Sequence, residues 1–264
     1  MSHGAVAEER RDTDGVPVLE LDGVTKHFGG VAAVAGVSVT VGRGEVVALV
    51  GNNGAGKSTI MRMVCGVHRP DSGEVRVDGK AVKFHSPRDA RTAGVEAVPQ
   101  ELALAGYLTV AANIFLGREL RHGWGPFAPL RRRAMTKRAA ELIEGFGITI
   151  PNMRARARDL SGGQQQGVAI GRAVAWGSQL VVLDEPTAAL GVHETEQVEN
   201  TVKKMRSSGV SAMLVSHQID QVFRVADRVY VLRQGQLVGE RVIASTTPEE
   251  IVSLITGAAG SRAA

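Results

Sequence analysis

Short apolar or alternating runs recur along the chain, and segments with helical periodicity lie between them. Such runs are typical of β-strands, whereas periodic segments that begin with Ser or Thr are typical of helices. Because strands and helices alternate, the pattern predicts an α/β protein. The predicted strands are residues 18–24, 34–41, 46–50, 74–80, 95–99, 179–183, 212–216, 228–232 and 236–239.

Helix starts carry recognisable capping residues. Ser86 before Pro87 and Thr109 are candidate N-caps, and residues 247–250 read as a capping box with proline at the first helical position. Residues 25–30 are predicted to form a turn. The predicted helices are residues 60–64, 87–94, 109–116, the segment up to 146, 164–175, 192–207, 218–226 and 247–256.

One domain is predicted over residues 17–259, and residues 101–175 within it read as an inserted helical subdomain. Residues 1–16 are polar and aperiodic, which predicts a disordered tail, and residues 260–264 are expected to fray. No apolar run approaches the ~20 residues that span a bilayer. The first 15 residues lack the apolar segment of a secretory signal.

Composition is ordinary for a soluble globular protein, with 44% hydrophobic and 22% charged residues. The single cysteine, Cys65, cannot form an internal disulfide, so we expect a reduced, cytosolic environment. The net charge of +4 fits solubility, nucleic acid or an anionic membrane face. Solubility is favoured over nucleic acid, because no basic stripe with interleaved aromatic residues is present.

Residues 51–59, GNNGAGKST, follow the apolar run 46–50 and precede a predicted helix. They match the phosphate-loop pattern G-x-x-x-x-G-K-[ST], whose glycines let the backbone wrap closely around phosphates. Lys57 would reach the β- and γ-phosphates, and the Ser58 hydroxyl would ligate Mg²⁺. A glycine-rich turn that only caps a helix is the alternative, and the strand–loop–helix setting disfavours it. The candidate nucleotide-binding residues are Gly51, Asn52, Asn53, Gly54, Ala55, Gly56, Lys57, Ser58 and Thr59.

Polar residues also follow three other predicted strands: Gln100, Asp184 with Glu185, and His217. The carboxyl ends of strands in an open α/β sheet converge on one ligand crevice. Asp184 is therefore a candidate Mg²⁺ ligand and Glu185 a candidate base for the attacking water. His217 becomes a candidate γ-phosphate contact in this setting, although a lone histidine is more often structural.

Three further features are open to two interpretations. Residues 161–164, SGGQ, precede a helix and form a second potential anion site. Phe28, flanked by glycines, is either a loop anchor or a stacking platform for a nucleobase, and the sequence favours neither. The basic residues at 131–133 and 137–138 fit a solvated helix face better than a lipid- or RNA-binding patch.

Over residues 18–259 the chain resembles the ATP-binding cassette (ABC) ATPases, because all these motifs stand in the family's order. The resemblance implies a P-loop NTPase fold with a RecA-like core, an antiparallel β subdomain and a helical subdomain. It implies ATP and Mg²⁺ as cofactors. Catalysis would fall to Glu185, His217 and Lys57, and metal binding to Ser58, Gln100 and Asp184. Nucleotide binding would extend to Phe28, Gln100, Ser161, Gly162, Gly163 and Gln164.

The resemblance also implies an ATP-sandwich homodimer, in which ATP on the phosphate loop of one subunit is covered by the SGGQ segment of the other. Within the family, residues 100–119 and 188–192 are similar to the ATPases of bacterial ribose, xylose and fructose importers. These work at the cytoplasmic face of the cell membrane with two membrane-spanning permease subunits and, indirectly, a substrate-binding protein. Nucleic acid is not expected as a partner.

Two alternatives remain: import of another solute such as amino acids, or a non-transport ABC ATPase acting on nucleic acid or ribosomes. The chain departs from the family at Gly191, where an aspartate usually follows the Ala-Leu pair.

Overall fold

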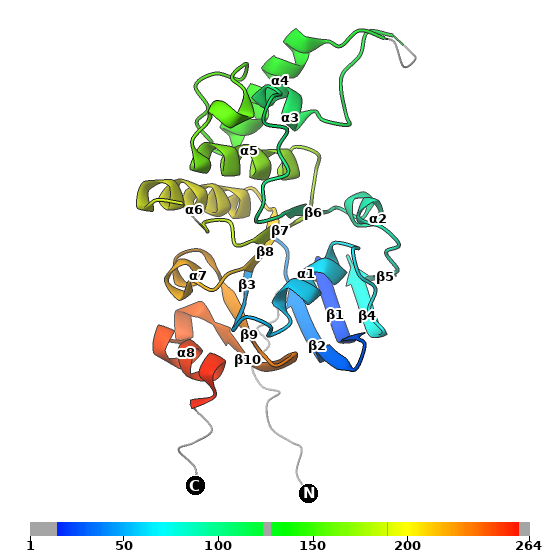
Figure 1. Ribbon diagram of the computed structural model, residues 1–264, viewed down its shortest axis with the longest axis vertical. Helices are drawn as coiled ribbons and strands as arrows, with labels where there is room; N and C mark the ends of the chain where they lie inside the picture. The colour runs from blue at the N-terminus through cyan, green and yellow to red at the C-terminus, as the bar shows by residue number, and fades with distance from the viewer. Residues whose placement is uncertain (1–14, 124–127, 189, 259–264) are drawn as a thin grey trace, which may run out of the picture.

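The computed structural model describes residues 15–123, 128–188 and 190–258 and contains two sheets with helices around them (Figure 1). Most of the predicted 1–16 tail, residues 124–127 and the predicted 260–264 tail therefore lie outside the described residues. The α/β fold class is confirmed: an antiparallel sheet has the order β2-β1-β4-β5, and a mixed sheet has the order β10-β9-β3-β8-β7-β6.

The antiparallel sheet consists of β1 (Leu19–Phe28), β2 (Val31–Val41), β4 (Ser72–Val77) and β5 (Lys80–Val82). The predicted turn at 25–30 is wrong, because β1 continues to Phe28. Lys26, His27 and Phe28 pair with the start of β2, and register shifts interrupt the alternation on which the prediction relied. The Asp71 carboxylate supports this part of β1 by accepting hydrogen bonds from His27 N and Lys26 Nζ.

The mixed sheet consists of β3 (Val46–Gly51), β6 (Val95–Val98), β7 (Leu180–Asp184), β8 (Ser211–Val215), β9 (Arg228–Arg233) and β10 (Gln236–Val242). Strands β6, β7, β8, β3 and β9 pair in parallel, and β10 returns antiparallel to β9. Every residue of β3 is buried, as expected for a strand that is covered on both faces. The carboxyl ends of β3, β7 and β8 therefore meet at one edge.

Helix α1 (Lys57–Val64) links the two sheets. Its buried residues Ile60, Met63 and Val64 belong to one core cluster with valines and leucines from β1, β2, β3 and β8. The antiparallel sheet is thus attached to the mixed sheet through the helix that follows the phosphate loop.

Helices α3 (Val110–Ile114), α4 (Arg132–Gly145) and α5 (Gly162–Val174) gather at one end of the molecule around a core cluster of their own (Figure 1). Thr109 caps α3 as predicted, but α3 ends two residues before Leu116. Glycine at 167 lets this end pack tightly, because a Cβ there would lie 2.7 Å from Ile148 Cγ2.

The other helices cover the mixed sheet: α2 (Pro87–Thr92), α6 (Val192–Ser207), α7 (Ile219–Val225) and α8 (Pro248–Thr256). Two short 3₁₀ turns lie at Ala157–Asp159 and Ile243–Ser245. Of the two hydrogen bonds in the capping box predicted at 247–250, one is present: Thr247 Oγ1 accepts from Glu250 N. The Glu250 carboxylate instead accepts from Thr246 and Arg241.

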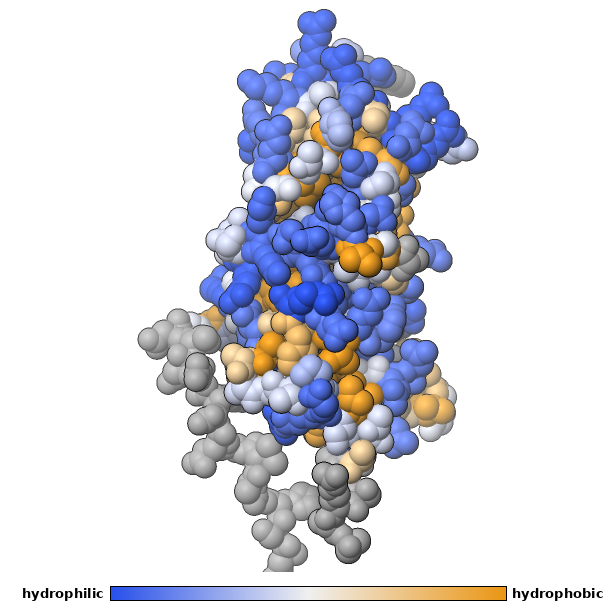
Figure 2. All heavy atoms as spheres, turned by 90° about the vertical axis from the view of Figure 1, so that its left-hand side faces the viewer, coloured by the Kyte–Doolittle hydropathy of each residue, from blue (hydrophilic) through white to orange (hydrophobic). Residues whose placement is uncertain are grey.

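The side that carries α6, α7 and α8 is mainly hydrophilic, with apolar side chains gathered in its lower part (Figure 2). In the interior, a core cluster that includes Ile251 and Val222 lies against α7 and α8. None of the helices in the described segments combines the length and the apolar character needed to cross a bilayer.

Replacing Gly167 by Ala should lower the free energy of unfolding by about 1–3 kcal/mol, because the new Cβ overlaps Ile148. Gly145→Ala is the matched control, since a Cβ at this end of α4 meets no atom within 4 Å. That control should be neutral or stabilising by up to about 1 kcal/mol. Urea unfolding measures both, and equal stabilities would contradict the packing argument.

Candidate nucleotide-binding site

The phosphate loop connects the end of β3 to the start of α1. Gly51 and Gly56 have positive φ values, 151° and 103°, in the region that favours glycine. A Cβ on Gly51 would lie 2.2 Å from Leu232 O, and one on Gly56 would lie 2.6 Å from Ala33 O. These two glycines are therefore required by the close approach of neighbouring backbone as well as by the curvature of the loop.

Lys57, the first residue of α1, is 7% exposed and folds back over the loop. Its Nζ donates hydrogen bonds to Gly51 O at 2.6 Å and Asn52 O at 3.0 Å. Burial lowers the pKa of Lys57, and the nearby carboxylates of Glu185 and Asp184 oppose this shift. The lysine therefore contacts the loop and feels the charge of both carboxylates.

A cavity of about 260 Å³ lies against the loop. Ligand pockets usually measure ~300–1,000 Å³, so this cavity suits a chain of phosphates better than a whole nucleotide. Its lining residues are Ala33, Asn53, Gly54, Ala55, Gly56, Lys57, Ser58, Thr59, Glu185 and Val215.

Asp184 ends β7 and is half-buried. Burial raises the pKa of this carboxyl, and the charge of Glu185 raises it further, while Arg62 and Lys57 act in the opposite direction. A carboxylate that is destabilised in this way favours a cation beside it.

The donors present fit Mg²⁺. The Ser58 hydroxyl and the Asp184 carboxylate supply oxygen, and Mg²⁺ usually takes only one or two carboxylates, with waters and phosphates as its remaining ligands. No cluster of three or more His, Cys, Asp or Glu side chains suited to a metal occurs in the described segments.

Glu185 and His217 face each other at the ends of β7 and β8. The Nδ1 atom of His217 lies 2.9 Å from Glu185 Oε1, and Glu185 N donates to Val215 O at 2.9 Å. Glu185 has a φ of 45°, a strained conformation for a residue with a side chain. The contact thus sets an imidazole against a carboxylate that lines the phosphate-loop cavity, and such a pair can orient and deprotonate a water molecule.

A buried polar network that the sequence reasoning missed supports this pair. Gln221 Nε2 donates to Thr187 Oγ1 at 2.8 Å, and Ser216 Oγ donates to Gln221 Oε1 at 2.9 Å. All three side chains are at most 3% exposed. The network joins the loop after β7 to the loop after β8. Gln221 lies among the apolar residues of the predicted 218–226 helix, and a polar residue in that position could have indicated a buried hydrogen-bond network.

Gln100 and Phe28 lie outside the residues that line the cavity. Gln100 is exposed and follows β6, which pairs with β7, so it stands at the same sheet edge as Asp184. Phe28 is 46% exposed and makes an edge contact with His68 at a centroid distance of 5.2 Å. Its ring is thus partly anchored by His68 and partly accessible.

The SGGQ segment forms the start of α5. Ser161 is the N-cap and accepts from Gln164 N at 3.4 Å, while Gln164 Oε1 accepts from Ser161 N at 3.1 Å. These residues do not line the phosphate-loop cavity. In Figure 1, α5 lies above α6 and α1 lies between the sheets below. One chain therefore does not assemble both helix starts around one cavity.

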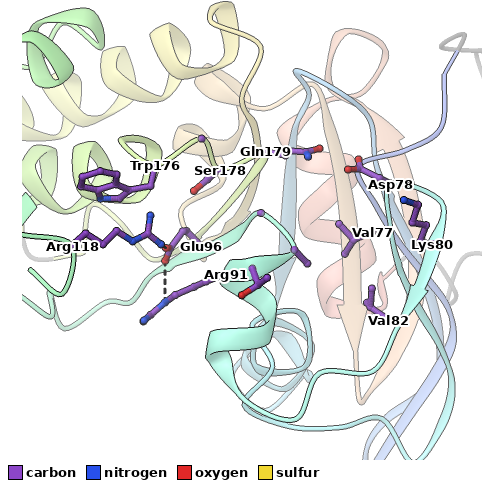
Figure 3. A pocket seen from close by; sticks show the side chains of 14 residues that line it. Val77, Asp78, Lys80, Val82, Arg91, Glu96, Arg118, Trp176, Ser178 and Gln179 are labelled. Atoms are coloured by element: carbon purple, nitrogen blue, oxygen red, sulfur yellow. Dashed lines mark ion pairs between the residues drawn. The ribbon is translucent and has the colours of Figure 1, made fainter. Parts of the chain in front are cut away.

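A larger cavity, of about 400 Å³, contains none of these motifs (Figure 3). It lies at the amino ends of β6 and β7. Glu96 there pairs with Arg91 at 3.3 Å and with Arg118 at 3.6 Å, and Arg118 stacks on Trp176. Burial raises the pKa of Glu96 against the opposing effect of its arginines. This ion-pair cluster ties α2, β6 and the segment after α3 together.

Comparison with known proteins identifies the family. A family model described as ABC transporter matches residues 34–188. The xylose/arabinose import ATP-binding protein XylG of Sulfolobus acidocaldarius is 40% identical over 239 residues, covering 90% of this chain and 94% of that protein. The fructose import ATP-binding protein FrcA of Rhizobium meliloti is 42% identical over 248 residues, covering 92% and 95%.

Solved structures of ATP-binding cassettes are similar to this chain in fold. A nucleotide-free ATP-binding cassette from an ABC transporter has a TM-score of 0.77 at 25% identity, covering 90% of this chain and 98% of its own. A dimeric cassette in a post-hydrolysis state, bound to ADP and Pi, has a TM-score of 0.70 at 27% identity, covering 85% and 98%.

Asp184→Asn should stabilise the nucleotide-free protein at pH 7 by about 1 kcal/mol, because it removes a half-buried charge beside Glu185. The folded pKa of Asp184 is raised, so its stabilising contribution is complete only below the unfolded pKa of about 3.9 and is lost as pH rises. The gain from the substitution should therefore shrink as pH falls toward 4.

Urea unfolding at pH 7 and pH 5 measures this difference. Asp220→Asn, at an exposed position in the first turn of α7, is the control and should change stability by less than about 0.5 kcal/mol. A variant at Asp184 that is no more stable than the wild type at pH 7 would refute the electrostatic argument.

Proposed function

Because the chain belongs to the ABC transporter family of ATPases, we propose that it is the ATP-hydrolysing subunit of an importer that drives sugar uptake. The observation that carries the chemistry is the Glu185–His217 pair: its carboxylate lines the same cavity as the phosphate loop. The observation that carries the solute class is the 40–42% identity to sugar import subunits over nearly their whole length.

The phosphate loop binds the phosphates of ATP through its backbone N–H groups and Lys57. Lys57 Nζ exchanges its bonds to Gly51 O and Asn52 O for phosphate oxygens. Ser58 and Asp184, with Gln100 at the same edge, would hold Mg²⁺, and this ion would neutralise charge on the phosphates. Phe28 stacks on the adenine outside the small cavity.

Glu185 acts as the general base. It takes a proton from a water molecule as the water oxygen bonds to the γ-phosphorus, and the bond to the bridging oxygen of ADP breaks. The products are ADP and Pi. His217 orients the Glu185 carboxylate and contacts the γ-phosphate, and the Thr187–Gln221–Ser216 network keeps the two loops in register.

Two copies of the chain complete two sites. The phosphate loop and the SGGQ segment do not share a cavity within one subunit, so ATP on one subunit is covered by Ser161, Gly162, Gly163 and Gln164 of the partner subunit. The homodimer works at the cytoplasmic face of the membrane with two permease subunits and, through them, a substrate-binding protein. Closure drives transport only if the closed dimer binds ATP better than the open form.

Replacing Glu185 by Gln should lower ATP hydrolysis at least ~100-fold while leaving ATP affinity within a few fold, because the base is lost but the phosphate loop is intact. The trapped ATP should hold a dimer on size-exclusion chromatography. Phosphate release and nucleotide titration measure the first two quantities. Glu144→Gln, at an exposed position on α4, is the control and should hydrolyse ATP at the wild-type rate. Undiminished turnover in the Glu185 variant would show that Glu185 is not the general base.

Deletion of the gene should abolish uptake of one or a few labelled sugars from a panel that includes pentoses, fructose and amino acids. Wild-type protein should restore uptake and the Lys57→Ala variant should not, because the γ-phosphate loses its cationic contact. The affinity-tagged chain should co-purify with a polytopic membrane protein. Loss of amino-acid uptake alone, or co-purification with RNA instead of a membrane protein, would replace the sugar-import proposal.

A further inference from the structure

Glu194 lies in the first turn of α6, and its carboxylate bridges the starts of two helices. Its Oε2 accepts from Gly191 N, the N-cap of α6, at 3.2 Å. Its Oε1 accepts from Gly163 N, in the first turn of α5, at 3.4 Å. Each helix start thus gives one N–H group to the same carboxylate.

The packing around this carboxylate is close. A Cβ on Gly162 would lie 2.7 Å from Leu190 Cδ2, and one on Gly163 would lie 3.0 Å from Glu194 Cβ. The hydrogen bond from Gly191 N, followed by those from Gly163 and Ser161, lowers the pKa of Glu194. Glu194 is therefore ionised at neutral pH, and the two glycines of the SGGQ segment admit it.

Position 191 explains why this carboxylate is needed. Helix N-caps favour Ser, Thr, Asp or Asn, whose side chains accept orphan N–H groups, and Gly191 has no side chain to do so. The glutamate three residues later reaches back to the Gly191 N–H group, as in a capping box. Its second oxygen remains free to bind α5. The negative charge that Gly191 lacks is thus supplied from within α6.

This inference rests on the proposed function, in which the SGGQ segment covers ATP bound to the partner subunit, so that the N-terminus of α5 would meet the phosphates of that ATP. We propose that Glu194 is an internal anion that occupies this phosphate position in the nucleotide-free subunit. It steadies the SGGQ segment before ATP arrives, and it must give up Gly163 N when the dimer closes. Two like charges cannot share one N–H group, so Glu194 sets the ATP concentration at which closure occurs.

Glu194→Gln separates this role from helix capping. Glutamine keeps an oxygen that can accept from Gly191 N but removes the charge. In a Glu185→Gln background, which stops hydrolysis, the added substitution should lower the ATP concentration for half-maximal dimerisation about tenfold, since the repulsion of the γ-phosphate is gone. The affinity of the monomeric subunit for ATP, which depends on the phosphate loop, should not change. Analytical ultracentrifugation over an ATP series measures the effect.

Glu196→Gln in the same background is the matched control: Glu196 is exposed on the same helix, and its substitution should leave dimerisation unchanged. Glu194→Ala, which removes both hydrogen bonds, should lower the thermal midpoint of the nucleotide-free protein and still ease closure. A lowered midpoint for the alanine variant, with an unchanged ATP requirement for the glutamine variant, would reduce Glu194 to a helix cap and overturn the proposal. Failure of the Glu185→Gln parent to dimerise would instead refute the proposed function.

Discussion

Parallel pairing of β3, β8 and β7 is the constraint on which the site depends. These strands are buried on both faces, so their order and register are set by the packing of α1 on one side and α6 on the other. Their carboxyl ends then deliver the phosphate loop, the Asp184–Glu185 pair and His217 to one edge. A slip of one residue in β7 would turn the carboxylate pair away from the loop.

The site that results is electrostatically costly without its ligands. Asp184 and Glu185 are adjacent carboxylates, Asp184 is destabilised by burial, and Lys57 is partly satisfied by carbonyl groups of its own loop. The strained backbone of Glu185 adds to this cost. A phosphate chain beside Lys57 and a cation beside Asp184 would relieve the two charge effects, whereas the backbone strain at Glu185 would remain.

A carboxylate is also held close to backbone N–H groups where the first turns of α5 and α6 meet. Gly162 and Gly163 were expected to serve anion binding, and in the structure they also admit Leu190 and Glu194 of the neighbouring segment. The departure at Gly191 therefore does not leave the junction without a carboxylate, because Glu194 provides one. The Gly163 N–H group donates to Glu194 in the nucleotide-free subunit. In the proposed dimer it would donate to the nucleotide bound on the partner subunit.

Phosphate-loop spacing, capping residues and short apolar runs are local signals, and from them the fold class, most strand and helix positions and the candidate motif residues could be predicted. It misplaced the end of β1, where long-range pairing with β2 overrides a glycine-rich turn signal. Which residues meet could not be predicted. The Glu185–His217 contact, the Thr187–Gln221–Ser216 network and the Glu194 bridge each join segments that are distant along the chain. Local patterns carry no information on such contacts, since those are set by how whole helices and strands pack.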